Sequence, residues 1–534
     1  MAIPAIWHAT APALPLLTAK DAADGDAYAI TNGDSASDLM WTAAGHLART
    51  VVAPRTSGYG RRVVIIVGKG NNGGDGYAAA LRLTASYGAH VTVVALDGTD
   101  VKTSPETAAF RAAWSATNRV MTDVPHALAA IDRADVVVDA VLGTGASGPF
   151  RGSVIDAVGL LAAAKRCGKE LVACDAPTGV DVDTGQVQSG TVAVQRTVTF
   201  GALKRGVVCA PAAAFCGTVT VGSLGVNWDT FVAARHDAAA RTGWPAVALT
   251  VLGARPHTYT YDMDKWQRGR VAVIAGVTGT AGAATLTAHG ALHAGAGLVH
   301  VYAGQAVADE IASSLQPEVM LNRLGADDVA TGDVAAPTWV TRLAGDPPDV
   351  VVAGPGLGVS QAAKDLVGSL LGTTCRLVLD ADALNVLRDN PKRLADHAGT
   401  LVITPHRKEL ARIGGGDTPA DAWDNRMERV PKLAVSLNAI IVAKGPSTLV
   451  AAPDGRVWVT PVGSPAAGTA GSGDLLAGVI AAAIARSRDP AHSVAQAVWW
   501  HARASEQAGQ ARAGRATAGH ILHALGPVFA ELHR

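Results

Sequence analysis

The chain has 534 residues, which is too long for one hydrophobic core and predicts roughly two to four domains. Its 45 Lys and Arg residues balance 45 Asp and Glu residues, which excludes a domain-wide positive field for nucleic acid or an anionic membrane and favours a small-molecule partner. The 59 glycines are more than average usage and indicate many tight turns and close approaches of the backbone to ligands.

Cysteine usage and the N-terminal residues indicate the compartment. The five cysteines are odd in number and contain no CxxC pair, which favours free thiols in a reducing environment. Pro4, Pro12 and Pro15 interrupt the first residues, which also lack a basic segment followed by an apolar one. No apolar run is long enough to span a bilayer. We therefore expect a cytoplasmic protein.

The first half predicts alternating helices and strands. Residues 18–49 have helical spacing with a break at Asn32-Gly33, and residues 63–67 predict a buried parallel strand. Residues 68–76 predict a glycine-rich loop, residues 77–87 a helix and residues 91–96 the next strand. Further strands are expected at residues 134–139 and 171–174. This order is that of a doubly wound sheet.

The loop at residues 68–76 has two interpretations. Gly68, Gly70 and Gly73 fit the GxGxxG fingerprint of dinucleotide-binding proteins, and Asp97 follows where a ribose-binding acid would lie, so a dehydrogenase is one alternative. However, the loop also contains Asn71, Asn72 and Asp75, which a pyrophosphate loop does not need. Their oxygens could instead ligate a monovalent cation or hold a polar ring, and Asn-Gly and Asp-Gly are also ordinary turn formers.

Polar residues follow three strands of this half. The carboxyl ends of strands in a doubly wound sheet form one crevice, so we expect a common site. Its members would be Asn72, Asp75, Asp139, Asp175 and Thr178.

Three segments of this half resemble the motifs of the NAD(P)H-hydrate epimerases over roughly residues 15–228: NNGGDG at 71–76, VDA with GTG at 138–145, and DAPTG at 175–179. The resemblance implies a Rossmann-like domain and a K⁺ ion held by Asn72, Asp139 and Thr178. It places the hydrated nicotinamide nucleotide on Asn71, Asn72, Gly73, Gly74, Asp75, Gly143, Thr144, Gly145, Ala146, Ser147, Gly148, Pro149 and Asp175. Asp175 is the candidate for proton transfer. Lys69 stands where the family usually has Pro, and Thr178 where it usually has Ser.

An Ala-rich, mixed-charge stretch at residues 233–241 marks the boundary between the halves. We predict a first domain of residues 1–228, a linker of 229–244 and a second domain of 245–534. In the second domain, strands are expected at residues 270–275, 298–302, 350–353, 376–379, 401–403 and 439–443, and a helix at 283–296. This alternation predicts another α/β domain.

Several of these strands lead into polar or glycine-rich loops: GPGLG at 354–358, DADALN at 380–385, TPH at 404–406 and KGPST at 444–448. A lysine followed by two hydroxyls suits a nucleotide phosphate, although Lys444 could also be an exposed turn residue. His406 could be an ordinary surface or core histidine, and the acids of DADALN could simply cap a helix.

The stretch Gly468–Gly478 carries the most chemistry. Gly471 and Gly473 permit a tight turn whose amides point at an anion, at the start of a helix predicted over residues 475–486. Asp474 would repel a phosphate but could take a proton from a hydroxyl beside it. An anion hole with a general base is predicted; a glycine-rich loop with Asp474 as helix N-cap is the alternative.

In this order, the loops of the second half resemble the ADP- or ATP-dependent NAD(P)H-hydrate dehydratases of the ribokinase-like superfamily, over about residues 245–530. The resemblance implies that Mg²⁺ assists. It places the hydrated nucleotide on Ala283, Gly358, His406 and Asp474. It places ADP on Lys444, Gly445, Pro446, Ser447, Thr448 and Gly473. Arg407 and Lys408 stand where the family usually has small residues.

Together the resemblances predict a bifunctional repair enzyme that interconverts the R and S epimers of hydrated NADH and NADPH and dehydrates the S epimer. A homo-oligomer, a tetramer or larger, is expected, with no nucleic acid or membrane as partner. The main alternative is a small-molecule kinase of the hydroxymethylpyrimidine or sugar type with a regulatory first domain. The first domain could also be a non-catalytic binding module.

Overall fold

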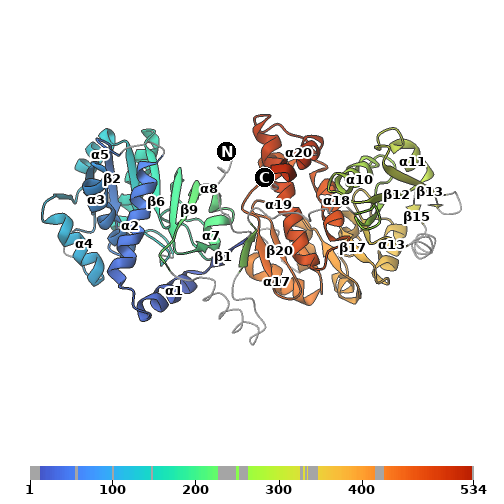
Figure 1. The fold of residues 1–534 in the computed structure, drawn as a ribbon, viewed down its shortest axis with the longest axis horizontal. Helices are drawn as coiled ribbons and strands as arrows, with labels where there is room; N and C mark the ends of the chain where they lie inside the picture. The colour runs from blue at the N-terminus through green and yellow to red at the C-terminus, as the bar shows by residue number, and fades with distance from the viewer. Residues whose placement is uncertain are drawn as a thin grey trace.

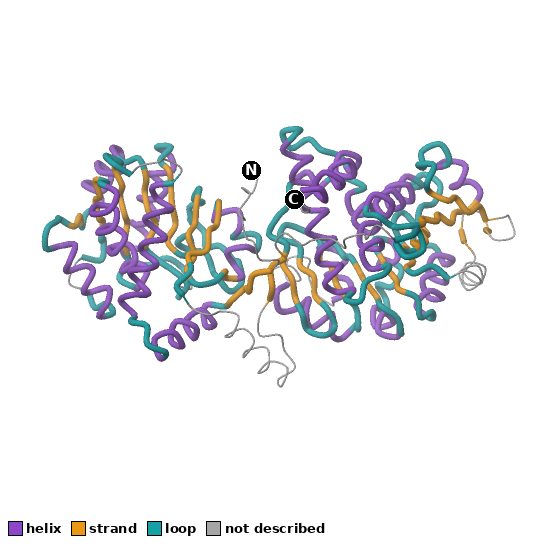
Figure 2. The backbone as a smooth tube through the Cα atoms, viewed as in Figure 1, coloured by secondary structure: helices purple, strands orange, loops and turns teal. Residues whose placement is uncertain are grey.

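The computed structural model describes residues 13–53, 58–98, 101–145, 148–225, 248–251, 263–324, 329–330, 333–334, 347–414 and 426–531. Two large sheets lie next to each other along the long axis of the molecule (Figure 1). Helices surround both of them (Figure 2). These layers confirm the predicted α/β fold class.

The first sheet has seven strands, all of them parallel to their neighbours. In spatial order they are β4 (Val120–Met121), β3 (His90–Val94), β2 (Arg62–Val67), β5 (Val136–Ala140), β6 (Glu170–Cys174), β7 (Arg196–Phe200) and β9 (Thr218–Gly222). The helices of this half are α1 (Ala19–Thr31), α2 (Ala36–Val52), α3 (Asn71–Tyr87), α4 (Pro105–Ser115), α5 (Val124–Arg133), α6 (Ser153–Arg166), α7 (Arg205–Val208) and α8 (Ala213–Cys216).

Strand β2 is apolar along its length because both of its faces are covered. Val63, Ile65 and Val67 join a core with α2 and α3, whereas Val64 and Ile66 join a core with α5 and α6. Successive side chains of a strand point to opposite faces, so a continuous apolar run is what a sheet covered on both sides requires.

The second sheet has twelve strands. In spatial order they are β13 (Val319–Leu324), β12 (Leu298–Gly304), β11 (Arg270–Ile274), β16 (Val350–Ala353), β17 (Arg376–Leu379), β18 (Leu401–Ile403), β19 (Ile440–Ala443), β20 (Leu449–Ala451), β21 (Val457–Val459), β10 (Ala248–Val251), β1 (Ala13–Leu17) and β8 (Leu203–Lys204). A separate antiparallel pair is formed by β14 (Val329–Ala330) and β15 (Asp333–Val334). The helices are α10 (Gly282–His293), α11 (Gln305–Ile311), α13 (Gln361–Leu371), α14 (Asp382–Asn385), α15 (Arg407–Gly414), α17 (Arg426–Ser436), α18 (Ser472–Ile484), α19 (Pro490–Gln510) and α20 (Ala518–Glu531), with 3₁₀ turns at Pro391–Asp396 and Pro465–Gly468.

The two halves share a sheet and a core. Strand β1 pairs with β10 on one side and with β8 on the other, so the second sheet takes in strands from both ends of the first half. Leu16, Leu203 and Val208 belong to one buried cluster that also contains Val457 and Val459. The predicted linker, 229–244, lies outside the described residues, and the division at residues 228 and 245 stays a prediction.

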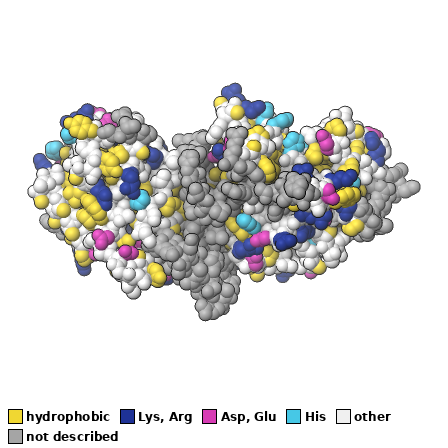
Figure 3. Space-filling view, in the orientation of Figure 1, with side chains coloured by type: hydrophobic (Ala, Val, Ile, Leu, Met, Phe, Trp, Pro, Cys, Tyr) yellow, Lys and Arg dark blue, Asp and Glu magenta, His cyan; other side chains and the backbone are white. Residues whose placement is uncertain are grey.

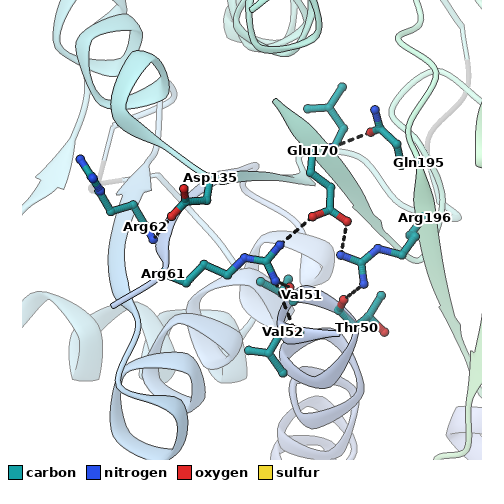
Figure 4. Close-up of polar contacts among 10 residues, drawn as sticks. Thr50, Val51, Val52, Arg61, Arg62, Asp135, Glu170, Gln195 and Arg196 are labelled. Atoms are coloured by element: carbon teal, nitrogen blue, oxygen red, sulfur yellow. Dashed lines mark hydrogen bonds and ion pairs between the residues drawn. The ribbon is translucent and has the colours of Figure 1, made fainter. Parts of the chain in front are cut away.

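Two arginines and one glutamate join the amino ends of three strands of the first sheet to α2 (Figure 4). Glu170 pairs with Arg61 at 2.7 Å and also with Arg196. Arg61 donates to the carbonyls of Val51 and Val52 in the last turn of α2. These carbonyls have no partner within the helix, so the network satisfies them and fixes α2 on the sheet, at the edge opposite to the strands' carboxyl ends.

Helix α3 corrects one prediction. It begins at Asn71, whereas the glycine-rich sequence predicted a loop up to residue 76. A Cβ at Gly76 would come within 2.8 Å of Val67 and 3.0 Å of Ala140, so the glycine lets the helix lie directly on the sheet. Tertiary packing outweighs the poor helix propensity of glycine here. The polar residues 71, 72 and 75 therefore lie in the first turns of a helix.

Other predictions concern surfaces and thiols. The five cysteines are free, and Cys174, Cys209 and Cys216 are buried. On the face in Figure 3, charged side chains of both signs are interspersed with apolar ones. Among the helices that the structure describes, none is long and apolar enough to cross a membrane.

Candidate active sites

A pocket of about 810 Å³ lies at the carboxyl ends of the strands of the first sheet. It brings together most residues that the sequence assigned to a hydrated nucleotide: Asn71, Asn72, Asp75, Gly143, Thr144, Gly145 and Asp175 line it. Of the five residues expected to converge, Asn72, Asp75 and Asp175 line this pocket, whereas Asp139 and Thr178 do not.

Asn72 lines this pocket, and its amide group is buried. The residue is 8% exposed, and neither its Oδ1 nor its Nδ2 has a hydrogen-bond partner within the described chain. Gly143 lies directly against it, since a Cβ there would come within 3.2 Å of the Asn72 side chain. Leaving a buried amide unpaired costs about 1–3 kcal/mol, so a ligand or ion is the expected partner.

Asp139 and Thr178 form a buried, hydrogen-bonded pair. Thr178 donates its hydroxyl to Oδ1 of Asp139 at 2.6 Å and its backbone N–H to Oδ2 at 2.7 Å. Both residues are almost completely buried, and burial raises the pKa of Asp139 although these hydrogen bonds oppose the shift. The oxygen atoms of Asp139, Thr178 and Asn72 are of the chemical type that hard cations prefer.

Asp175 is held by a residue that the sequence analysis missed. Lys204 Nζ donates to Asp175 Oδ1 at 2.7 Å, and Thr199 donates to the same oxygen at 3.0 Å. Burial favours the neutral acid, but the Lys204 ammonium and these hydrogen bonds outweigh it and hold the pKa of Asp175 below its ordinary value. Asp175 also has φ 64°, a left-handed conformation that is unusual for a residue other than glycine and marks a constrained site.

The remaining predicted residues of this site have other positions. Gly73 and Gly74 lie buried in α3, where a Cβ would come within 1.9 Å of the Gly68 carbonyl or 2.4 Å of Thr107 Oγ1. Gly148 and Pro149 do not line the pocket, and Ala146 and Ser147 lie outside the described residues.

The second site is built around the start of α18. The helix begins at Ser472, three residues earlier than predicted, so Asp474 lies within its first turn. Gly471 precedes it as N-cap with φ 84°, a left-handed conformation that glycine adopts without strain. The Ser472 N–H group donates to the Thr469 carbonyl at 3.3 Å. The N–H groups of Gly473 and Asp474 have no acceptor among the described residues and are available to an anion.

Lys444 lies against this helix start. A Cβ on Gly473 would be 3.2 Å from Lys444 Nζ, and the same nitrogen contacts Asp380 Oδ1 at 2.6 Å. Thr404 donates to Asp380 Oδ1 as well, also at 2.6 Å. Strand ends β17, β18 and β19 therefore deliver a fixed ammonium to the place where the helix offers its N–H groups.

The surroundings of Asp474 favour its uptake of a proton. Burial and the negative charges of Asp380 and Asp382 raise its pKa to about 6, although the Lys444 ammonium opposes the shift. A carboxyl with a pKa near the working pH combines a useful ionised fraction with a strong tendency to take a proton. Beneath the turn, Ser472 Oγ lies 3.5 Å from the buried His501 Nε2, and burial lowers the pKa of His501 to about 4, so the ring is neutral.

His406 caps a helix in this structure. Its Nδ1 accepts the backbone N–H groups of Lys408 and Glu409 at the start of α15. Its Nε2 points toward Glu409 Oε1 at 3.4 Å, and the side chain is 51% exposed. His406 also pairs in a β-bridge with Lys444, so it borders the ammonium site.

The other predicted residues lie either around the GPGLG loop or in the loop after β19. Ala283 lies beside the GPGLG loop, 3.1 Å from a Cβ placed on Gly356, and Gly358 N–H donates to Asp382. In the loop after β19, Gly445 and Pro446 are exposed, and Thr448 bonds to Gly445. Ser447 is buried and donates its hydroxyl to the Val208 carbonyl of the first half at 2.7 Å.

These features define an enzyme of α/β architecture with one pocket for a small polar ligand and one helix-terminus anion site. Known families match the same two regions. The model of the "YjeF-related protein N-terminus" family matches residues 36–206, and that of the "NAD(P)H-hydrate dehydratase" family matches residues 271–526.

Relatives match most of the chain. The bifunctional NAD(P)H-hydrate repair enzyme Nnr of Moorella thermoacetica is 34% identical over 88% of this chain and 88% of its own. That of Coxiella burnetii is 33% identical over 90% and 92%, and that of Escherichia coli is 32% identical over 80% and 77%. A solved ADP/ATP-dependent NAD(P)H-hydrate dehydratase from Bacillus subtilis, co-crystallised with ATP and Mg²⁺, is 28% identical and covers 52% of this chain and 95% of its own, with a TM-score of 0.45.

The chain belongs to the family of bifunctional NAD(P)H-hydrate repair enzymes. The predicted enzyme class, an epimerase joined to a dehydratase, is confirmed by the two family matches and the full-length relatives.

Proposed function

We propose that the first pocket exchanges the R and S epimers of hydrated NADH and NADPH, and that the α18 site dehydrates the S epimer with ADP or ATP as phosphoryl donor. The observation that carries this proposal is the second site, where an ammonium, a free helix N-terminus and a carboxyl with a pKa of about 6 lie together. This combination suits proton removal beside a transferring phosphoryl group.

In the second site, hydroxide is a poor leaving group and has to be activated. Asp474 takes the proton of the ring hydroxyl, and the resulting oxygen attacks the terminal phosphorus of the nucleotide. The bond to the leaving nucleotide breaks, while Lys444 and the N–H group of Gly473 stabilise the charge on the phosphoryl oxygens. Phosphate then leaves as the ring nitrogen supplies an electron pair, and loss of the neighbouring C–H proton forms the double bond.

Mg²⁺ would neutralise phosphate charge in this reaction. Within the described residues there is no cluster of three acidic, histidine or cysteine side chains that could hold a metal ion. This fits Mg²⁺, which commonly binds through one or two carboxylates together with substrate phosphates and waters, so the nucleotide would bring it.

In the first site, the unpaired amide of Asn72 and the buried pair of Asp139 and Thr178 fit a K⁺ ion. The ion would supply a fixed positive charge next to the substrate. Asp175 is the residue of this site that we assign to proton transfer, with Asn71, Asn72, Asp75 and the loop of residues 143–149 around the substrate.

One assay tests both activities. Purified protein is given mixed epimers of hydrated NADH with ADP, ATP or no nucleotide, and NADH is followed by its near-ultraviolet absorbance while chromatography follows the epimers. Nucleotide-dependent conversion of both epimers to NADH is expected. A stable phosphorylated product without NADH would support the kinase alternative. Consumption of the S epimer alone would indicate that the first domain binds its ligand without catalysing epimer exchange.

The assembly and compartment are also proposals. The free cysteines support a reducing compartment such as the cytoplasm. A homo-oligomer, a tetramer or larger, stays a prediction that light scattering can test.

A further inference from the structure

Eight charged side chains line the first pocket, including Lys69, Asp97, Glu106 and Arg151. The other four interact electrostatically with one another and come from four different elements: Asp26 of α1, Asp75 of α3, Asp175 after β6 and Lys204 of β8. The family motifs account for Asp75 and Asp175 only. Asn72, buried and with an unpaired amide, lines the same pocket and indicates that a polar ligand belongs there. The arrangement of the four charges can therefore be considered as part of a ligand site.

Lys204 has no donor left for a ligand. An ammonium has three N–H donors, and Lys204 directs them to Asp175 Oδ1 at 2.7 Å, Thr199 Oγ1 at 3.0 Å and the Phe200 carbonyl at 2.8 Å. Its side chain is only 3% exposed. Lys204 can thus act on the pocket only through the residues that it holds.

Asp175 presents one oxygen to the pocket. The hydrogen bonds from Lys204, Thr199 and the Phe200 backbone all reach Oδ1. No hydrogen bond to Oδ2 is found in the part of the chain that the structure describes, and this residue lines the pocket, so Oδ2 is the oxygen that a substrate can reach.

Asp75 is in the opposite electrostatic situation. Burial and the negative charges of Asp175 and Asp26 raise its pKa well above the ordinary value, and Lys204 opposes this only in part. Burial, with Asp175 as a smaller contribution, likewise raises the pKa of Asp26. The surroundings thus favour the ionised form of Asp175 and the protonated form of Asp75, which suits the two carboxyl groups to opposite roles.

On the basis of the proposed epimerase function, we propose that Asp175 is the base and Asp75 the acid of epimer exchange, and that Lys204 is the positioning residue that keeps Asp175 ionised with Oδ2 toward the substrate.

The reaction needs only these two groups. The carbon that bears the hydroxyl group is bonded to the ring nitrogen. Asp175 takes the hydroxyl proton, the carbon–oxygen double bond forms, and the carbon–nitrogen bond breaks with its electron pair going to nitrogen, which takes the proton of Asp75. The open aldehyde turns its other face, nitrogen adds back, Asp75 recovers its proton from nitrogen, and Asp175 returns its proton to oxygen. No oxidant or reductant is required.

The experiment compares Asp75→Asn, Lys204→Met and Lys204→Arg with the wild type and with Lys165→Met, an exposed lysine on α6. Exchange of the R epimer is followed by chromatography from pH 5 to 9, after subtraction of the spontaneous rate. Because the pKa of Asp175 lies below its ordinary value, the wild-type kcat/KM should show no acidic limb in this range and should decrease only at high pH, as Asp75 ionises. Asp75→Asn should lower kcat by about 10²–10⁴-fold with little change in KM.

Lys204→Met removes the charge that lowers the pKa of Asp175, so an acidic limb should enter the measured range, whereas Lys204→Arg should keep the wild-type profile. A rate that falls equally at every pH in Lys204→Met would mean a purely structural role and would overturn the positioning role. Wild-type exchange by Asp75→Asn would overturn the acid–base pair while the epimerase function stands. Absence of exchange by the wild type itself would overturn the proposed function of the pocket and this inference with it. The dehydration rate of each variant reports whether the chain is folded.

Discussion

Each of the two sites contains a Lys–Asp ion pair, but the first site exposes mainly the carboxylate and the second mainly the ammonium. Each lies beside a helix that follows a glycine, α3 in the first site and α18 in the second, at the carboxyl ends of parallel strands. Lys204 pairs with Asp175 at 2.7 Å, and Lys444 pairs with Asp380 at 2.6 Å.

The difference between the pairs is which partner is buried. In the first site the lysine side chain is 3% exposed and the carboxylate 11%, whereas in the second the lysine is 19% exposed and the carboxylate 1%. The first pair thus offers a carboxylate oxygen to its ligand, and the second offers an ammonium. Under the proposed function, this difference suits the first site to proton transfer and the second to a phosphate.

The largest expected effect comes from Asp474→Asn, which removes the base of the second site only. Dehydration should fall by about 10²–10⁴-fold, because that is the usual contribution of a positioned general base, while epimer exchange continues at the wild-type rate. The measurement is NADH formation from the S epimer with ADP. Asp396→Asn, at an exposed position of the same half, is the control. Normal NADH formation by Asp474→Asn would show that another group takes the proton.

The pH dependence sharpens the same assignment. The base must be ionised to work, and its pKa is raised to about 6, so kcat/KM for dehydration should decrease below that pH. For folding the sign is opposite: the raised pKa means that Asp474 contributes stability at low pH that is lost as the pH rises through about 6. Asp474→Asn should therefore have a higher Tm than the wild type at pH 8 and a similar Tm near pH 4. If the wild type and Asp474→Asn had the same Tm as each other at pH 8 as well as at pH 4, the raised pKa of Asp474 would be contradicted.

Lys444→Met tests the exposed end of the second ion pair. A charge-assisted hydrogen bond to a phosphate contributes about 1.5–3 kcal/mol, so the KM for ADP should rise by roughly 10–100-fold. Epimer exchange should not change, because the first pair is intact. Lys392→Met, on an exposed turn, provides the control. An unchanged KM for ADP in Lys444→Met would show that the nucleotide does not depend on Lys444. It would contradict the role given to the second ion pair.

Asp139→Asn tests the cation in the first site. If K⁺ binds the folded protein only, a concentration ten times its Kd stabilises the protein by about 1.4 kcal/mol. The wild type should therefore have a higher Tm in KCl than in choline chloride at equal ionic strength, and this difference should disappear in Asp139→Asn. The same K⁺ response in both proteins would exclude Asp139 as a ligand.

The sequence predicted the members of both sites that lie in glycine-rich motifs directly after strands. Asp175 and Asp474 belong to such motifs, since each follows a strand end or a glycine turn within a few residues. Lys204 carries no such signal, because it lies 29 residues after Asp175 on a strand of two residues. Lys204 does follow an apolar segment of the sequence, and a lysine in such a position indicates a buried and therefore paired charge.

The fold could be predicted where apolar runs are continuous. The prediction failed where contacts between distant parts of the chain determine the structure. Strands such as β2 and β16 are buried on both faces and could be read directly. The early start of α3 depends on how closely Gly76 approaches the sheet. Strand β1 pairs with β10 through residues as far apart in the sequence as Ala13 and Val251. Such short strands have no local sequence pattern from which their pairing partners could be predicted.

The smallest expected effect concerns the contact between the halves. Ser447 was predicted to bind ADP, yet its buried hydroxyl donates to Val208, which follows Lys204 by one short helix. Ser447→Ala should lower the free energy of unfolding by about 1 kcal/mol, as for a typical hydrogen bond. Ser436→Ala, which removes an exposed hydroxyl bonded to Leu433 within its own helix, should cost much less. Calorimetric Tm values and the KM for ADP separate the two roles. A lower Tm with normal KM assigns Ser447 to the contact between the halves, and an unchanged Tm with a raised KM assigns it to the nucleotide, as its motif indicates.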